Sequence, residues 1–332
     1  MKNYHASFPS TRLRRLRRTQ SLRDLGTETR LAPANLIQGV ILRDDKEPAD
    51  IPAMGGVTRL TIDEASALAA RAVELGLGGL ALFPFTHASD RDEAGSQAFD
   101  PENLMCRAAR ALKAAVPKVT LIGDVALDPY TDHGHDGLME EDGTIFNDRT
   151  VAALAQQAIL LAEAGFDVVA PSDMMDGRIG AIRLALEERG HQDTIILSYA
   201  VKYASAFYGP YRDAVGSRGA LKGDKKTYQM NPANAEEGLR EAALDIEEGA
   251  DMLMVKPGLP YLDMVTRVKD TFGVPTVAFQ VSGEYAMLHT ASKAGAFDFD
   301  TALMESLLAF RRAGADAVIT YGAERAARLL KG

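Results

Sequence analysis

The stretch EGADMLMVKPGLP, residues 248–260, carries the pattern that decides the fold. A helix-ending glycine comes first, an aspartate follows two residues later, and an apolar run then leads directly into Lys256. The same order of glycine, aspartate and apolar run recurs in AGFDVV (164–169) and AGADAVIT (313–320). Repeated units that end a helix and begin a strand are typical of an alternating βα array.

Eight apolar, β-branched runs of strand length lie along the chain, and helical patterns such as 152–165 (with Gly165 as its C-terminal cap), 181–190 and 237–249 lie between them. Eight such units predict an α/β fold, a (β/α)₈ TIM barrel. The alternative is a doubly wound open sheet, but no GxGxxG follows an early strand. The predicted strands are 35–42, 78–85, 119–127, 166–172, 194–200, 251–257, 275–282 and 316–322.

Composition excludes several classes of protein. The net charge of −9 over 332 residues argues against a nucleic-acid partner, since such proteins need a basic surface. The single cysteine, Cys106, excludes a disulfide framework and a thiolate zinc site. No apolar run is long enough to span a bilayer, and the N-terminus lacks a signal-peptide core. We therefore expect a cytoplasmic protein with no membrane partner.

The first 32 residues form a predicted arm that differs from the barrel predicted over 33–332. RLRRLRR (12–18) places five arginines in seven positions. One interpretation is a nucleic-acid-binding or targeting arm, and the other is an arm that packs on an acidic neighbouring subunit. The acidic body favours the second interpretation.

In a barrel of this kind, the chemistry lies at the carboxyl ends of the strands. Polar residues close or follow most of the predicted strands, and this many of them predict one converging polar pocket. They are Asp124, Asp128, Ser172, Asp173, Ser198, Lys202, Lys256, Ser282 and Tyr321.

Lys202 and Lys256 follow or end neighbouring strands, which lie about 4.8 Å apart in a sheet. Burial and a second ammonium group both disfavour the charged amine, and a neutral amine can attack a carbonyl. Lys256 is thus a candidate Schiff-base nucleophile, with Lys202 as its electrostatic partner or a second nucleophile. The alternative is that each lysine extends to solvent or holds a carboxylate.

Two further segments are candidate parts of the site. One is the stretch 124–137, DVALDPYTDHGHDG, which is either an Mg²⁺ or Mn²⁺ site or a polar loop shaped by its glycines. The long segment 203–232 reads as an active-site lid, at about 203–230, or as a solvated loop. Ser282 and Tyr321 either bind a substrate carboxylate or are structural hydroxyls. The cations of the lid suit a substrate carboxylate or phosphate. The cations are Arg212, Arg218, Lys222, Lys225 and Lys226.

Six stretches show that the sequence resembles the porphobilinogen synthase (5-aminolevulinate dehydratase) family from about residue 12 to the end. They are HGHDG (133–137), APSDMMDG (170–177), SYAVKYASAFYGPYR (198–212), KGDKKTYQMNP (222–232), MLMVKPGLPYLD (252–263) and QVSGEYAM (280–287). The resemblance implies a barrel with an N-terminal arm that condenses two 5-aminolevulinate molecules to porphobilinogen, with loss of two waters. This is an early step of tetrapyrrole biosynthesis.

The resemblance also implies residue roles. Lys256 matches the lysine that forms a Schiff base with the substrate supplying the propionate side, and Lys202 matches the lysine that holds the other substrate. Arg212, Lys225 and Gln229 match lid residues near one substrate carboxylate. Ser282 and Tyr321 match the pair that binds the other carboxylate, and Asp124 and Ser172 stand at strand ends of the same site.

Zinc-dependent members carry three cysteines where this sequence has Ala126, Asp128 and Asp136, so a three-thiolate zinc site is excluded. We expect no cofactor to be required, with the two aspartates orienting the free amine of the second substrate or moving its proton. Glu241 matches the position that holds an activating, water-rich Mg²⁺ in some members.

The family forms homo-octamers, and hexamers occur as an alternative assembly, which assigns the basic arm to a neighbouring subunit. A Schiff-base aldolase of another substrate is the main alternative; it would expect a glycine-rich phosphate site after the last two strands. A metal-dependent hydrolase built on DHGHDG and a nucleic-acid binder are two others. Borohydride trapping of a substrate on lysine would exclude both of these.

Overall fold

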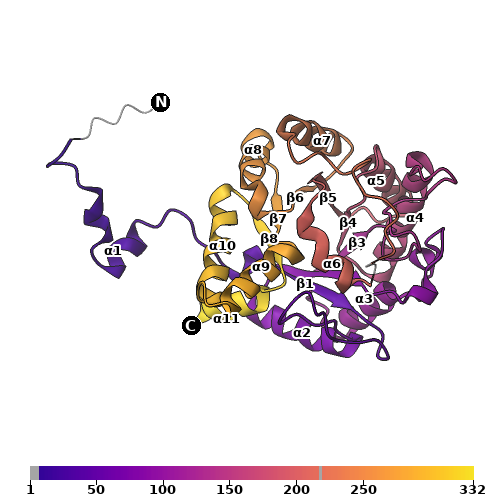
Figure 1. Cartoon of the computed structure of the whole chain (residues 1–332), viewed down its shortest axis with the longest axis horizontal. Coiled ribbons are helices and arrows are strands. Elements are labelled where there is room, and N and C mark those ends of the chain that lie inside the picture. The colour runs from indigo at the N-terminus through magenta and orange to yellow at the C-terminus, as the bar shows by residue number, and fades with distance from the viewer. Residues whose placement is uncertain (1–6, 217–218) are drawn as a thin grey trace.

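The structure is a computed structural model that describes residues 7–216 and 219–332. Eight parallel strands close into a barrel in sequence order, with β8 pairing back to β1 (Figure 1). The prediction of a (β/α)₈ barrel is confirmed, and each strand except β5 lies within its predicted run. The strands are β1 (Leu36–Leu42), β2 (Gly79–Pro84), β3 (Leu121–Val125), β4 (Val168–Pro171), β5 (Ile195–Lys202), β6 (Met252–Lys256), β7 (Thr276–Phe279) and β8 (Ala317–Thr320).

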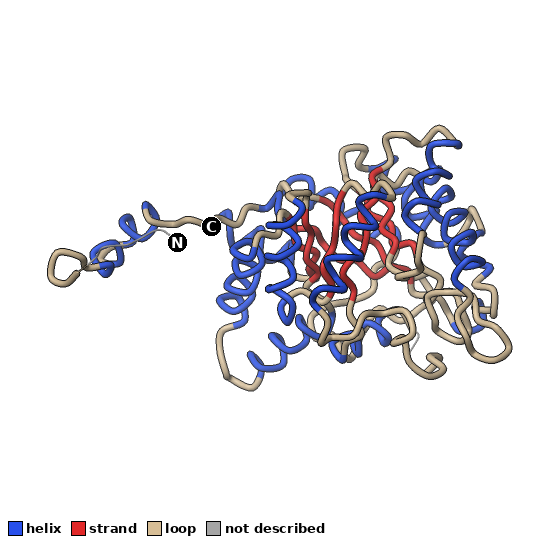
Figure 2. Tube along the Cα trace, turned by 90° about the horizontal axis from the view of Figure 1, so that it is seen from above, coloured by secondary structure: helices blue, strands red, loops and turns tan. Residues whose placement is uncertain are grey.

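Helices surround the barrel on its outer side, as Figure 2 shows from above. Gly165 ends α4 at φ 106°, in the left-handed region that glycine adopts without strain, as the sequence predicted. The longer helices are α2 (Ile62–Leu75), α3 (Leu104–Ala115), α4 (Asn147–Ala164), α5 (Arg178–Glu188), α7 (Ala235–Glu247), α8 (Leu262–Phe272), α9 (Ser282–Lys293), α10 (Phe299–Ala313) and α11 (Ala323–Lys331). Shorter elements are α1 (Gln20–Leu25), α6 (Gly209–Ala214) and the 3₁₀ turns η1 (Leu13–Arg17), η2 (Pro33–Asn35), η3 (Ala88–Asp90), η4 (Ser96–Phe99), η5 (Ala206–Tyr208) and η6 (Leu259–Tyr261).

Strand residues alternate between two apolar layers, because successive side chains point to opposite faces of a strand. In β6, Leu253 and Val255 pack outward against helices, whereas Met254 joins a cluster that fills the barrel interior. Lys256 continues this alternation on the inner side, at the end of the strand where the loops open. The fold therefore places a lysine at the mouth of an otherwise apolar barrel.

The repeated aspartate joins neighbouring strands at the opposite, amino-terminal end of the barrel. Asp251 accepts a hydrogen bond from the Ile196 backbone N–H at 2.8 Å and pairs with Arg183 of α5 at 2.5 Å. Two further sets repeat this arrangement: Asp167 with Leu121 N–H and Lys113, and Asp316 with Thr276 N–H and Lys269. Each set links the first or second residue of one strand to the aspartate just before the next strand and to the helix that precedes the first of these strands.

The described part of the N-terminal segment lies away from the barrel (Figures 1 and 2). It holds η1 and α1, and its residues Leu13, Leu16 and Leu25 are exposed to at least half of their area. These three leucines thus find little cover within this chain. Residues 1–6 of the predicted arm lie outside the described residues. Among the residues described, no helix is both long and apolar enough to cross a membrane.

Candidate active site

A bulge in β5 brings Lys202 beside Lys256. The parallel register pairs Ser198 with Leu253 and Val201 with Val255, so β5 carries one extra residue between these two pairs. The register then pairs Lys202 with Lys256. Without the extra residue, the alternation that turns Leu197 into the barrel would turn Lys202 outward. The bulge therefore directs both lysines into the same mouth.

Aromatic rings surround the Lys256 amine. The Nζ atom lies 4.9 Å from the centre of the Tyr199 ring, 5.3 Å from Tyr208, 5.4 Å from Tyr211 and 5.0 Å from Phe279. The centre of the Tyr199 ring also lies 6.0 Å from the Lys202 Nζ, so this ring is near both amines. These rings exclude water from the amine and leave Lys256 only 7% exposed.

Burial, joined by the charge of Lys202, lowers the pKa of Lys256 to about 7 against the opposing attraction of Asp124. Burial also raises the pKa of Asp124 to about 7, although Lys256 opposes that rise. One oxygen of Asp124, Oδ1, is buried without a hydrogen-bond partner in the structure. With both pKa values near 7, a neutral Lys256 amine, the form that can attack a carbonyl, is accessible near neutral pH, close to a carboxyl group that can take up or release a proton.

The second lysine faces a cluster of two aspartates and a lid cation. Lys202 donates to the Ser172 backbone carbonyl and lies 3.5 Å from Asp136. Lys225 of the lid lies 2.6 Å from Asp136 and 3.1 Å from Asp128. Burial alone would raise the pKa of Asp136, but Lys202 and Lys225 outweigh burial and hold that pKa below its usual range. An ammonium group thus occupies the space between the two carboxylates.

The lid covers the lysines and leaves little space beneath it. Arg212, on the short helix α6, and Gln229 line the same cavity as Lys202 and Lys256, and the cavity measures about 30 Å³. That is room for about one water molecule, which is less than a substrate molecule occupies. The sequence predicted a loop here, and α6 and η5 are the helical parts that it did not reveal. Arg218 lies outside the described residues.

His135 connects the predicted metal-binding stretch to the lid. Its Nε2 lies 2.6 Å from the Lys222 carbonyl oxygen, and its Nδ1 lies 3.0 Å from the Tyr228 hydroxyl. Tyr228 in turn donates to Asp136 at 3.0 Å. The HGHDG segment therefore acts here as a lid contact. Among the described residues, no group of three or more His, Cys, Asp or Glu side chains is arranged to hold a metal ion.

Ser282 and Tyr321 carry two buried hydroxyls without a hydrogen-bond partner in the structure. Ser282 begins α9 and is 1% exposed, and Tyr321 follows β8 and is 6% exposed. The Tyr321 ring lies 6.1 Å from Phe279, one of the rings around Lys256. Buried hydroxyls are normally paired, so both are available to a polar ligand group.

Two of the strand-end residues do not face the pocket. Ser198 donates to Asp245 of α7, on the outer side of the barrel. Asp173 lies 3.6 Å from the fully buried Arg178, which also pairs with Asp245 at 3.1 Å. Sequence reasoning placed Ser198 and Asp173 in the pocket, and it missed the rings of Tyr199 and Phe279, whose inward positions on β5 and β7 were the available signal.

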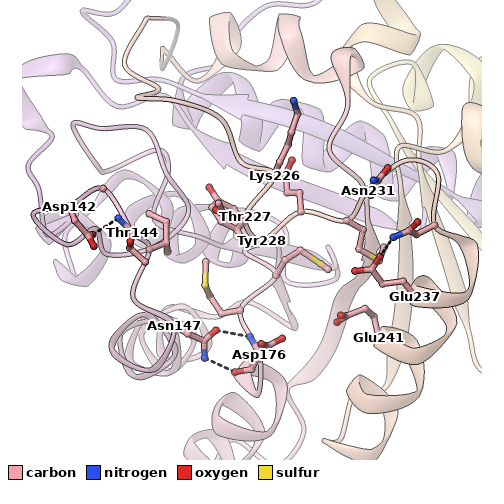
Figure 3. Close-up of a pocket in the computed structure, with 17 residues that line it drawn as sticks. Asp142, Thr144, Asn147, Asp176, Lys226, Thr227, Tyr228, Asn231, Glu237 and Glu241 are labelled. Atoms are coloured by element: carbon pink, nitrogen blue, oxygen red, sulfur yellow. Dashed lines mark hydrogen bonds between the residues drawn. The ribbon is translucent and has the colours of Figure 1, made fainter.

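Glu241 lies on α7, away from the lysines, and lines a separate cavity of about 630 Å³ beside the lid. Figure 3 shows Glu237 and Glu241 on the same helix and Asp176 across the cavity from them. Burial raises the pKa of Glu241, and the nearby carboxylates of Asp245, Asp176 and Glu237 add to that rise while Arg178 opposes it.

The closed barrel and its two buried lysines define a class of βα-barrel enzyme in which a lysine amine can attack a carbonyl group. A family model described as delta-aminolevulinic acid dehydratase matches residues 10–329. The delta-aminolevulinic acid dehydratase of Bradyrhizobium diazoefficiens is 55% identical over 96% of this chain and 91% of its own length. That of Rhodobacter capsulatus is 54% identical over 97% of both chains.

A solved structure extends this likeness to the fold. The delta-aminolevulinic acid dehydratase (porphobilinogen synthase) of Toxoplasma gondii, in complex with the reaction product porphobilinogen, matches with a TM-score of 0.93. It is 47% identical and covers 96% of this chain and 91% of that one. The chain belongs to the delta-aminolevulinic acid dehydratase family and is a hydro-lyase of that activity.

Proposed function

We propose that Lys256 and Lys202 each form an imine with one of two 5-aminolevulinate molecules, and that the two are joined here into porphobilinogen. The observation that carries this proposal is the pairing of the two lysines at the mouth of β5 and β6. The depressed pKa of Lys256 supports it, because a neutral amine is the form that attacks a ketone.

The chemistry follows from two imines held side by side. Each lysine adds to a ketone and expels the oxygen as water, and the resulting protonated imine withdraws electrons. Loss of a proton from the carbon next to one imine gives an enamine, whose carbon attacks the imine carbon of the other substrate and forms the C–C bond. The free amine of that other substrate attacks the imine carbon of the first and forms the C–N bond. At each attacked carbon the bond to the lysine nitrogen then breaks, so the lysine leaves as its amine, and a final proton loss makes the five-membered ring aromatic. Asp124 is proposed to accept or return these protons, and the rise of its pKa to about 7 through burial supports this role.

Asp128 and Asp136 are proposed to bind the amine of the second substrate. The position of the Lys225 ammonium, in contact with both carboxylates, supports this role because a substrate ammonium has the same charge and donors. A substrate amine would displace Lys225 from these carboxylates. Lys225 could then bind a substrate carboxylate together with Arg212 and Gln229. Ser282 and Tyr321 would bind the other carboxylate through their unpaired hydroxyls.

We further propose that catalysis needs no metal and that Mg²⁺ acts from outside the site. Ala126 offers no ligand, and Lys225 and Lys202 already pair with the carboxylates of Asp128 and Asp136. Glu241 faces a cavity with other carboxylates near it, which suits a cation that keeps most of its waters. Assembly through the basic arm into an octamer or hexamer, and placement in the cytoplasm, remain predictions from the sequence.

The test is to treat the protein with EDTA, add 5-aminolevulinate and measure porphobilinogen with and without Mg²⁺. We expect activity without metal and a modest rise with Mg²⁺ that the E241A variant lacks. A strict metal requirement that E241A retains would place the metal at the aspartates and overturn this part of the proposal. No porphobilinogen under any condition would overturn the assigned reaction.

A further inference from the structure

The lid helix α6 ends against two buried arginines from other parts of the chain. Carbonyls at the end of a helix have few partners within it, and three carbonyls at the end of α6 accept hydrogen bonds from guanidinium groups. Arg59 donates to Asp213 O at 2.6 Å and Ala214 O at 2.7 Å, and Arg91 donates to Val215 O at 2.8 Å. Arg59 comes from the β1–α2 segment and Arg91 from the β2–α3 segment.

Both arginines are fixed on their own side as well. Arg59 also donates to the carbonyls of Pro48 and Asp50 at 2.9 and 2.7 Å, and its guanidinium lies 4.4 Å from the centre of the Phe85 ring. Arg91 donates twice to Thr86 O. The chain leaves α6 at Gly216, where φ is 77° and an added Cβ would lie 2.5 Å from Phe85. The contact is therefore close-packed and specific, and we call Arg59 and Arg91 the α6 clamp.

Helix α6 carries two residues of the site. The Tyr211 ring lies 5.4 Å from Lys256 Nζ and packs edge-on against Phe83 at 5.8 Å, and Arg212 lines the cavity over the lysines. At the other end of α6, the Tyr208 hydroxyl donates to the Tyr203 carbonyl at 2.8 Å and lies 3.2 Å from the Lys256 carbonyl oxygen. With the α6 clamp at its far end, this helix of six residues is held at both ends.

We propose that Arg59 and Arg91 are positioning residues for the reaction, which hold Tyr211 against Lys256 and Arg212 over the cavity by binding the carboxyl end of α6. The inference rests on the proposed roles of Lys256 and Arg212. A positive charge is also favourable at a helix C-terminus, which explains why arginine rather than a neutral donor stands there.

Loss of the clamp has a distinct consequence for Lys256. If Tyr211 moves, water reaches the amine, and the burial that lowers its pKa is reduced. The neutral amine then forms only at higher pH. Arg91 also attracts Asp128, so R91M removes that attraction as well, whereas the charges that act on Arg59 are those of other residues. The other charged or titratable groups around Lys256 lie on β3, β5, the β3–α4 segment and the lid. They are Asp124, Asp128, Asp136, Tyr199, Lys202 and Tyr208.

The test compares R59M and R91M with R183M in the full-length protein. Arg183 also donates to backbone carbonyls, but at the opposite end of the barrel, so R183M controls for lost stability. We expect KM for 5-aminolevulinate to rise about 10-fold to 100-fold in the clamp variants, since small misplacements of site residues have effects of this size. We also expect the pH dependence of borohydride trapping at Lys256 to move to higher pH. R183M should lower the melting temperature but change neither the KM nor the pH dependence of trapping.

R91K is the alternative if a methionine variant does not fold, since it retains the charge and one donor. A second readout is partial recovery of R91A with added methylguanidinium but not with equal sodium chloride. Folded clamp variants with the wild-type KM and pH dependence would overturn the inference. An R183M variant with the same changes in KM and pH dependence as the clamp variants would also overturn it. R212M separates the two proposals: an unchanged KM there refutes the role of Arg212, while the pH shift still tests the clamp through Tyr211.

Discussion

Lys202 and Lys256 are partners in the parallel register of β5 and β6, and a one-residue bulge in β5 is what aligns them. The two amines nevertheless lie in different surroundings. Lys256 is enclosed by four aromatic rings, whereas Lys202 faces the Ser172 carbonyl and Asp136. The Lys256 amine is therefore shielded from water, which suits attack on a carbonyl group. The Lys202 amine instead lies beside a carboxylate with which it can exchange a proton.

The first prediction concerns the separate roles of these amines. K256M removes the proposed nucleophile, so we expect porphobilinogen formation to fall by more than about 10⁴-fold, as for other covalent nucleophiles. K202M should fall comparably, but it should still trap one 5-aminolevulinate on Lys256 with borohydride. Mass spectrometry of the trapped peptides checks this. K226M, which changes an exposed lid lysine paired only with Asp224 among the described residues, is the control and should trap normally.

The second prediction concerns pH. Asp124 favours the charged form of Lys256, and Lys202 disfavours it. D124N should therefore lower the pKa of Lys256 and move the acid limb of imine trapping to lower pH, whereas K202M should move it to higher pH. The measurement is the yield of borohydride-trapped adduct on Lys256 between about pH 5 and 9. Shifts in the same direction for both variants would contradict this electrostatic account. D142N, at a fully exposed carboxylate, should leave the limb in place.

Sequence patterns predicted the barrel because its strands are short apolar runs bounded by glycine and aspartate. They could not reveal the bulge in β5, since one extra residue changes the facing of a side chain without changing composition. The strand was accordingly predicted to stop at residue 200, with Lys202 beyond it. Helix α6 was missed because six residues are too few for periodicity, and because its carboxyl end is bound by Arg59 and Arg91, which lie more than a hundred residues earlier in the sequence.

The candidate site shows the same division. Lysines, aspartates and hydroxyls at strand ends can be read from the sequence, because the barrel fixes where strand ends meet. Which of these side chains enter the pocket depends on the direction in which each one points. Ser198 contacts Asp245 and Asp173 contacts Arg178, so these two do not enter it. The rings around Lys256 come from β5, β7 and the lid, and only the folded chain brings them together.

The third prediction tests the repeated aspartates at the amino-terminal end of the barrel. D251A removes the acceptor of the Ile196 N–H and the partner of Arg183, so unfolding should become easier by about 1–3 kcal/mol. The kcat should not change, because the site lies at the other end of the strands. D251N, which retains an acceptor oxygen but loses the charge, should lie between D251A and the wild type. Denaturant melts and steady-state assays on the same preparations check this. A large loss of kcat in folded D251A would contradict the proposed separation of stability from catalysis.

The fourth prediction concerns closure of the lid by His135. H135A removes the contacts to the Lys222 carbonyl and the Tyr228 hydroxyl, which hold the second half of the lid over the site. We expect the open lid to be more populated, with KM raised several-fold and kcat reduced less. Trypsin should then cleave faster after Lys222, Lys225 or Lys226, and saturating 5-aminolevulinate should slow that cleavage.

H133A is the matched control for this prediction. His133 is equally buried in the same segment, but its ring contacts the Glu93 carbonyl and the His135 backbone N–H instead of the lid. Both substitutions open a similar space in the core, so they should lower the melting temperature alike. Only H135A should accelerate lid cleavage and raise KM. Equal cleavage rates for the two variants would show that His135 supports the fold of its loop and does not hold the lid.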